Sequence, residues 1–235
     1  MKKKILFIAV MALLTVGFAS CEKESLGKTQ ITYYAEIQLE GESQMIIDKG
    51  STYVEPGFTA TMAGKDVSDQ VTVTGDVDTS ASGVYTISYS VVNADGFVAS
   101  ASRTVVVLDP ADPIEGFWQL DASVSTRDYN GTVASYKGNF QILFLSEGAG
   151  TYFVDDLFAG WYAQGAGYGT AYAMQAEITI AADGTITLEY SYVPGWGDSA
   201  DYLNAGVYDA ANKQITYKVG YAGIMEFDVT LNKVE

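Results

Sequence analysis

From residue 31 onward, short β-forming stretches alternate with turn residues, and this pattern restricts the fold more than any other feature. The stretches are rich in Val, Thr, Tyr and Ile, and Gly, Asp and Asn separate them. No stretch keeps a helical period long enough to predict a helix. Alternation over Val84–Val91 instead places every second side chain, from Tyr85 to Val91, on one face of a strand. We therefore predict an all-β protein.

Between Tyr33 and Leu108 the strand-like stretches recur at intervals of about 8 to 12 residues, the spacing typical of a β-sandwich. Asn93-Ala94-Asp95-Gly96 separates the two longest stretches. Because Asp-Gly tolerates the positive φ of a tight turn, we expect a hairpin there. The two strands that it joins should form the long central pair of the sandwich.

Five short motifs occur in a characteristic order and spacing within this part: Gly50–Phe58, Gly64–Val67, Val77–Thr79, Gly83–Tyr85 and Arg103–Val105. Together they resemble the Ig-like repeat of bacterial surface proteins, which is also found in some insecticidal crystal toxins. Members of that family usually have Asp where Glu55 stands. The resemblance implies an Ig-like β-sandwich over residues 30–109 that serves as a spacer or adhesive module, and it implies no activity.

Two of the four prolines lie within Asp109-Pro110-Ala111-Asp112-Pro113. Proline cannot donate to a β ladder, so we expect the sandwich to end here and residues 110–113 to form a stiff linker. The two acids could suggest calcium, but this cation prefers six to eight oxygen ligands. A solvated linker without calcium is the favoured interpretation.

The remaining residues, 114–235, contain their own hairpin signals at Asn130-Gly131, Asp183-Gly184 and Asp209–Asn212. Consecutive hairpins form a meander, which can close into a barrel or fold into a sandwich. Alternation over Met225–Leu231 predicts a strand with one apolar face. We expect an antiparallel meander β-barrel or sandwich after the Ig-like β-sandwich.

Gly116-Phe117-Trp118 resembles the Gly-x-Trp opening strand of lipocalin-like barrels, and the resemblance implies a lipocalin-like sheet with Trp118 in its core. Such barrels usually have a closing arginine stacked on that tryptophan. Arg127 is the only arginine after Arg103, and no counterpart of the closing arginine is evident. Tyr190 and Tyr192 are also expected in the core, at alternating positions of a strand.

The N-terminus has the pattern of an export signal. Lys2 to Lys4 precede an almost unbroken apolar run, Ile5–Val16, which is shorter than the roughly 20 residues of a membrane-spanning helix. Phe18-Ala19-Ser20-Cys21 then resembles the lipobox of bacterial lipoproteins, in which the cysteine becomes the first, acylated residue. We predict a signal peptide over residues 1–20, lipidation at Cys21 and a tether over residues 21–29.

Cys21 is the only cysteine, so it has no partner for an internal disulfide. Glu22-Lys23-Glu24 resembles the acidic signal that directs some lipoproteins to the outer face of the outer membrane. The predicted location is the outer membrane, with a lipid anchor and exposure at the cell surface.

Composition excludes several classes of function. With 13 Lys and Arg against 29 Asp and Glu, the net charge of −16 argues against nucleic acid as a partner. Histidine is absent, which removes imidazole bases and His-ligated zinc. We predict no catalytic residues, no cofactor and no metal, although Asp155-Asp156 and Asp198 with Asp201 are nominal carboxylate pairs for a glycosidase.

All three tryptophans lie after residue 116, and two of them are in stretches that do not alternate. These stretches, 158–169 and 193–202, have glycines around their aromatics and therefore resemble loops more than strands. Aromatic faces with polar neighbours suit the apolar faces of sugar rings. The candidate ligand-binding residues are Trp161, Tyr162, Tyr168, Trp196, Asp198 and Tyr202.

Two interpretations of these loops stay open: they plug one end of the sheet, or they form a binding platform. For the whole chain we predict a non-catalytic accessory binding protein, with a glycan as its ligand, like the small lipoproteins of starch-utilisation-type uptake systems. The alternative is a structural or adhesive protein that binds another surface protein through its C-terminal domain.

Overall fold

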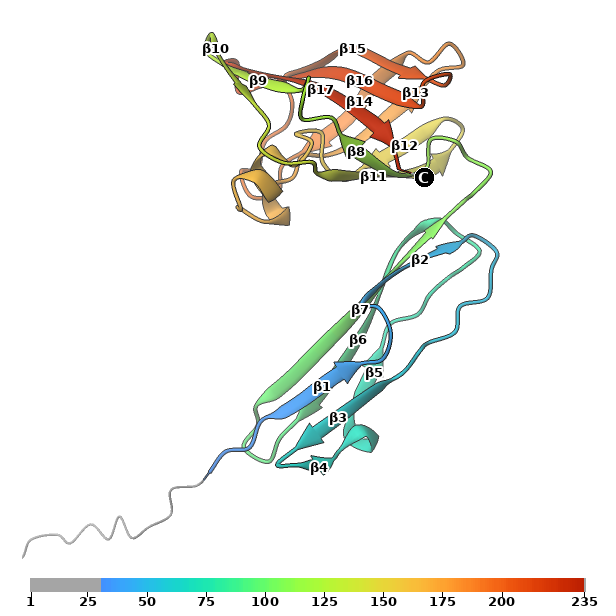
Figure 1. Ribbon diagram of the computed structural model, residues 1–235, viewed down its shortest axis with the longest axis vertical. Helices are drawn as coiled ribbons and strands as arrows, with labels where there is room; N and C mark the ends of the chain where they lie inside the picture. Colours follow the sequence, from blue (N-terminus) through green and yellow to red (C-terminus); the bar gives the residue numbers. More distant parts are fainter. Residues whose placement is uncertain (1–30, 235) are drawn as a thin grey trace, which may run out of the picture.

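The computed structural model describes residues 31–234, so the predicted signal peptide, Cys21 and the tether lie outside the described residues. The chain forms two groups of strands, β1 to β7 and β8 to β17, which share no sheet (Figure 1). Helical structure in this range is limited to short turns. The all-β prediction is confirmed.

The N-terminal group is an Ig-like sandwich of two sheets, ordered β1-β3-β4 and β2-β7-β6-β5. Neighbouring strands are antiparallel except β2 and β7, which are parallel. The chain therefore leaves the first sheet after β1 and joins the second as β2. The strands are β1 (Ala35–Leu39), β2 (Gln44–Asp48), β3 (Phe58–Met62), β4 (Lys65–Asp66), β5 (Thr72–Thr74), β6 (Gly83–Val92) and β7 (Val98–Leu108).

β6 and β7 form the long central hairpin that the sequence predicts, and they pair over the whole of β6. Asn93 closes the turn, because its Oδ1 accepts the backbone N–H groups of Asp95 at 3.1 Å and Phe97 at 2.8 Å. Ile87 and Tyr89 are buried, as the alternation of β6 predicts.

Arg103 joins two of the Ig-like motifs, because it binds Glu55 and Gly57 of the Gly50–Phe58 segment. Its side chain is fully buried on β7, and its Nε donates to Glu55 Oε1 at 3.0 Å. Nη2 donates to the carbonyl oxygens of Glu40 at 2.7 Å and Gly57 at 3.1 Å, and Nη1 donates to that of Glu42. One guanidinium thus holds the crossing between β1 and β2 together with the loop that leads to β3.

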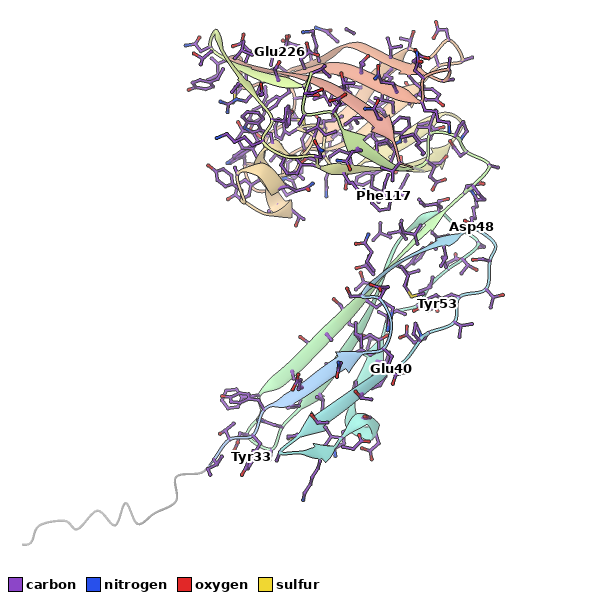
Figure 2. All side chains as sticks on the ribbon, in the orientation of Figure 1. Tyr33, Glu40, Asp48, Tyr53, Phe117 and Glu226 are labelled. Atoms are coloured by element: carbon purple, nitrogen blue, oxygen red, sulfur yellow. The ribbon has the colours of Figure 1, made fainter. Side chains whose placement is uncertain are left out.

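Glu55 is the anionic partner in this arrangement, in the place where family members usually have Asp. Desolvation raises its pKa, but hydrogen bonds from Tyr53 and the Gly57 N–H, together with the charge of Arg103, outweigh this and leave the pKa below the usual range. Figure 2 shows Tyr53 in the extended segment before β3. The longer glutamate therefore still supplies a carboxylate to the buried arginine.

The C-terminal group is one strongly curled antiparallel sheet, in which β9 and β10 extend beyond the curl. The pairing runs β8-β11-β12-β13-β14 on one side and β8-β17-β16-β15 on the other, and a single bridge, Thr185 with Val207, joins the ends. The strands are β8 (Gly116–Leu120), β9 (Thr126–Tyr129), β10 (Thr132–Ser135), β11 (Gln141–Gly148), β12 (Thr151–Val154), β13 (Gln175–Ile180), β14 (Ile186–Tyr192), β15 (Tyr202–Asp209), β16 (Gln214–Tyr221) and β17 (Met225–Lys233). The predicted lipocalin-like meander is confirmed.

Trp118 lies fully buried inside this sheet, as predicted, and its Nε1 donates to the Ile114 carbonyl at 2.8 Å. A lysine lies over the Trp118 ring, which the sequence pattern did not indicate. Lys233, near the end of β17, places Nζ 4.9 Å from the centre of the Trp118 ring and donates to the carbonyls of Ile114 and Glu115. Desolvation at this position lowers the Lys233 pKa to about 8.

Tyr190 and Tyr192 are not in the core, contrary to prediction: their side chains are 58% and 38% exposed. The pairing of β13 with β14 shifts register between Glu177 and Ile178, where Leu188 and Tyr190 face them. This bulge adds one residue to β14 and reverses the alternation beyond it. Ser191 consequently points inward and is buried.

No helix within residues 31–234 combines the length and the apolar character needed to span a bilayer.

Candidate binding site at the loop end of the C-terminal sheet

The loop between β12 and β13 closes one end of the curled sheet (Figure 1). Its first part, Leu157 to Ala159, is fully buried. The chain then forms a π-helical turn, η2 (Trp161–Gly165), and a 3-10 turn, η3 (Thr170–Tyr172), which contain no buried residue. The root of the loop therefore plugs the sheet, while its outer part remains at the surface.

Asp156 holds the two ends of this loop together. It is buried, and its Oδ1 accepts the backbone N–H groups of Phe158 at 2.9 Å and Met174 at 3.0 Å. Its Oδ2 accepts the N–H of Gly160 at 3.0 Å. These bonds satisfy backbone donors that no strand partner reaches, which is the requirement for burying an irregular segment.

The nominal glycosidase carboxylates are all engaged in such structural contacts. Burial raises the pKa of Asp156 to about 7 and that of Asp155 to about 6, against the lowering effect of backbone N–H donors. Asp155 accepts the Leu143 N–H at 2.9 Å. Asp201 accepts the Gly223 N–H at 2.7 Å, and Asp198 accepts a hydroxyl, as described below. These four aspartates therefore stabilise loops through hydrogen bonds.

Gly160 allows the loop to turn at the edge of the plug. Its φ is +84°, and a Cβ at this position would lie 2.5 Å from the ring of Phe140. A Cβ at Gly165 would lie 3.2 Å from the same ring. Only glycine permits both the left-handed backbone and this close approach, so Phe140 fixes the position of η2.

The sequence-predicted aromatics Tyr162, Tyr168 and Trp196 lie together, and we call this set the aromatic platform. The Tyr162 ring centre is 4.8 Å from that of Trp196 in an edge-to-face arrangement and 6.0 Å from that of Tyr168 in a stacked one. Tyr168 is 55% exposed and Trp196 is 40% exposed, whereas Tyr162 is half-buried. Two loops distant in sequence thus present adjoining ring surfaces to solvent.

Contacts beneath the platform hold the Trp196 loop in place. The Gly195 N–H donates to the Ala171 carbonyl at 2.6 Å, which joins the two loops. Trp196 also stacks on Tyr221, with ring centres 5.8 Å apart. Asp198 accepts the Tyr221 hydroxyl at 2.8 Å, so this candidate residue supports the platform and keeps its carboxylate beside it.

Trp161 points to a different part of the surface from Trp196. Its ring centre lies 4.8 Å from that of buried Tyr136, edge to face, and the ring is half-buried. It lines a cavity of about 210 Å³ together with Tyr136, Phe140 and Lys137. No ring contact joins the two tryptophans in the described part of the chain.

Tyr202 lies outside the platform as well. Its hydroxyl donates to Glu226 at 2.8 Å, on the side of the C-terminal sheet far from the Ig-like sandwich (Figure 2). Both residues line a hollow of about 470 Å³, which Met225 also borders. The Tyr162 hydroxyl donates to Met225 Sδ at 3.1 Å, so Met225 lies between the hollow and the platform.

Sequence reasoning missed several residues of this region: Arg127, Tyr136, Phe140, Tyr172 and Tyr221. Arg127 lies over Trp161, with its guanidinium carbon 4.6 Å from the ring centre. Its strand gives no sequence signal that it faces an aromatic loop some 30 residues away. Among residues 31–234, no three acidic, cysteine or histidine side chains cluster in a way that could hold a metal ion.

Two family models match the chain. Residues 37–107 match the Ig-like domain of bacterial surface proteins, and residues 108–233, more than half of the chain, match a model described as a C-terminal domain. No match was found among curated proteins.

Among solved structures, the chain is similar to the lipoprotein BT2262 from Bacteroides thetaiotaomicron, with 34% identity and a TM-score of 0.75 over 85% of this chain and 100% of that one. It also overlaps structures of ZmpB from Clostridium perfringens. One contains the M60 catalytic domain with two CBM51 domains, at 18% identity and a TM-score of 0.28 over 52% of this chain and 14% of that one. The other contains CBM51-2 with GlcNAc and INT domains, at 15% identity and a TM-score of 0.27 over 85% and 44%. Overlaps this weak support no inference.

Proposed function

This chain belongs to the family of the lipoprotein BT2262, and from that premise we propose that it is a non-catalytic glycan-binding lipoprotein of the outer-membrane surface. Acyl chains on Cys21 attach it to the membrane, because two or three buried chains give a stable anchor. The Ig-like sandwich is a spacer. The loop end of the C-terminal sheet binds the ligand, in the service of polysaccharide uptake.

One observation carries the glycan proposal: the aromatic platform exposes large ring surfaces although the sheet beneath it is already plugged. Phe158 fills the end of the sheet, so Tyr168 and Trp196 are not needed to close it. Exposed, preorganised rings with a carboxylate beside them have the composition of a sugar-binding surface. The ring contacts among Tyr162, Tyr168 and Trp196 keep these rings in place before a ligand arrives.

Absence of catalysis is part of the proposal. The matched families are a lipoprotein family and the Ig-like domains of surface proteins, which are not enzyme families. The chain contains no histidine, and the adjacent carboxylates Asp155 and Asp156 accept backbone N–H groups in the interior. A glycosidase needs two acids that both reach the scissile bond.

The test is a glycan array probed with residues 22–235, followed by titration of the strongest glycan. We expect Trp196→Ala and Tyr168→Ala each to weaken binding by about 1 to 3 kcal/mol, the range for an aromatic at the centre of a binding surface. Tyr190→Ala is the matched control, because this tyrosine is 58% exposed on β14 and has no ring contact with the platform among the described residues.

Melting curves separate lost contacts from lost folding. Trp196→Ala should lower the melting temperature only slightly, since the ring is 40% exposed, whereas truncation of a fully buried aromatic costs about 3 to 5 kcal/mol. A protein that binds no glycan, or binds one equally well without Trp196 and Tyr168, would contradict the proposal. It would then favour the alternative, an adhesive component that binds another surface protein.

A further inference from the structure

Arg127 is a cation whose charge has no anionic partner in the described structure. It lies on β9, half-buried, with its guanidinium carbon 4.6 Å from the ring centre of Trp161 and 5.4 Å from that of Tyr129. Within residues 31–234 it makes no ion pair, and its buried Nε has no hydrogen-bond acceptor. The N–H groups of an arginine normally donate to carboxylates or carbonyls. A half-buried guanidinium without a carboxylate partner therefore indicates a role in binding.

Among the described residues, Lys218 and Lys233 of the C-terminal sheet, unlike Arg127, have partners for their charge or their donors. Lys218 pairs with Asp228 at 2.6 Å and with Glu226 at 3.3 Å. Lys233 lies over the Trp118 ring and donates to nearby carbonyls. Lys137, however, is exposed and has no carboxylate within ion-pair distance in the described part of the chain. The two unpaired cations thus flank one ring, because Lys137 lines the cavity beside Trp161 and Arg127 covers that ring.

Arg127 also borders the aromatic platform. Phe227 pairs with Arg127 across β17 and β9, and its ring centre lies 6.0 Å from that of Tyr162. Burial raises the pKa of the Tyr162 hydroxyl, while the side chain of Arg127 acts to lower it. Tyr162 in turn contacts Trp196 and Tyr168. Positive charge therefore lies between the platform and the Trp161 cavity, in a chain whose net charge is −16.

We infer that the saccharide bound at this end carries an anionic group, a carboxylate or a sulfate on the ring, and that Arg127 binds it. This inference rests on the proposed glycan function and specifies the class of sugar. A guanidinium on an aromatic face binds carboxylates and sulfates through paired N–H donors. Lys137 adds charge at the rim of the cavity. A neutral glycan would leave Arg127 and Lys137 without an anionic partner. The excess of acidic side chains elsewhere on the protein would repel an anionic saccharide from other parts of the surface.

The experiment compares ligands that differ only in charge. Short oligogalacturonates are titrated against their methyl esters, and dextran sulfate against dextran. We expect the wild type to bind at least one anionic ligand about ten- to a hundredfold more tightly than its neutral form, with a preference that falls as salt rises. The carboxylate and sulfate arms identify which anion is recognised, and Arg127-dependent binding of either supports the inference.

Variants connect the preference to Arg127. Arg127→Gln should remove most of the anionic preference, measured as the ratio of the affinities for the charged and the neutral form, whereas Arg127→Lys should keep part of it. Lys65→Gln is the control for loss of one positive charge, because Lys65 is exposed on β4 in the Ig-like sandwich. If Arg127→Gln fails to fold, as a melting curve will show, the wild-type comparison of acid with ester still decides the question.

Two results would overturn the inference: equal wild-type affinity for charged and neutral forms, or a loss in Arg127→Gln that is the same for both. If neutral glycans bind through Trp196 under those conditions, the proposed function stands and only the anionic class is rejected. If no saccharide binds in a platform-dependent manner, both proposals fall.

Discussion

Two cations, one in each group of strands, donate to irregular backbone: Arg103, which is buried, and Lys233, which is half-buried. Arg103 donates to three carbonyls and to Glu55 where the chain crosses between sheets. Lys233 donates to two carbonyls beside Trp118 where the curled sheet begins. In both cases backbone carbonyls accept from the side chain of a residue on the last strand of its group. Removing either cation would take a donor from these carbonyls, although Ile114 would keep the bond from Trp118 Nε1 and Gly57 the bond from the Glu40 N–H.

The Glu55–Arg103 pair should make the Ig-like sandwich sensitive to acid. Because the folded-state pKa of Glu55 is depressed, its contribution to stability is present above the unfolded value of about 4.5 and is lost as pH falls through the folded value. We expect Glu55→Gln to cost about 1 to 3 kcal/mol of unfolding free energy at pH 7. Urea unfolding should show this difference shrinking towards pH 3.

Glu55→Asp serves as the control, because it keeps the carboxylate that most family members have. It should retain most of the stability that Glu55→Gln loses at pH 7. A difference between wild type and Glu55→Gln that is the same at pH 7 and pH 3 would show that the charge of this side chain does not matter.

At the scale of elements, the loop of residues 155–174 has two parts with different roles. Asp156 gathers backbone donors from both ends of the loop, and Phe158 fills the end of the sheet. Beyond Gly160 the chain is free to present Tyr162 and Tyr168 at the surface. The alternatives of plug and platform therefore apply to successive parts of one loop.

Gly160→Ala should displace this loop. The substitution combines a positive φ with a Cβ placed against Phe140, so we expect a loss of about 2 to 4 kcal/mol in unfolding free energy. Gly167→Ala is the matched control in the same loop: its φ is +72°, but its Cβ would meet nothing within 4 Å. It should lose only about 1 kcal/mol. Equal losses in urea unfolding would mean that the contact with Phe140 does not position the loop.

At the scale of the whole molecule, the strands form two groups in line, and the candidate site lies in the second group, after the Ig-like sandwich (Figure 1). If Cys21 carries the lipid, this order holds the aromatic platform away from the membrane. The linker acids take part in the junction, since Asp109 pairs with Lys49 at 3.4 Å and Asp112 accepts the Tyr152 hydroxyl. The predicted boundary at residues 110–113 stays a prediction.

Cys21→Ser should move the protein from the membrane fraction to the soluble fraction of expressing cells. The acyl chains supply the attachment, at about 0.8 kcal/mol for each buried methylene, and serine cannot be acylated in the same way. Fractionation followed by immunoblotting measures the change. The Arg127→Gln variant, which leaves the N-terminus intact, should remain with the membrane. Retention of Cys21→Ser in the membrane fraction would contradict the lipoprotein assignment.

The sequence by itself determined the strands, the hairpin turns and the Ig-like motifs, because alternation, Asp-Gly turns and motif spacing are local properties of the chain. It also placed Trp118 in the core and identified the two aromatic loops. The alternation failed at Tyr190 and Tyr192, because a bulge depends on how β13 pairs with β14 and leaves no mark in either strand alone.

Only the tertiary structure decided which distant side chains meet. Lys233 reaches Trp118 from the other end of the domain, and Arg127 reaches Trp161 from a neighbouring hairpin. It separated Trp161 and Tyr202 from the platform of Tyr162, Tyr168 and Trp196. The physical reason is that a curled sheet brings its loops together by closure, and the curvature follows from the pairing of all its strands. No single segment of sequence contains that information.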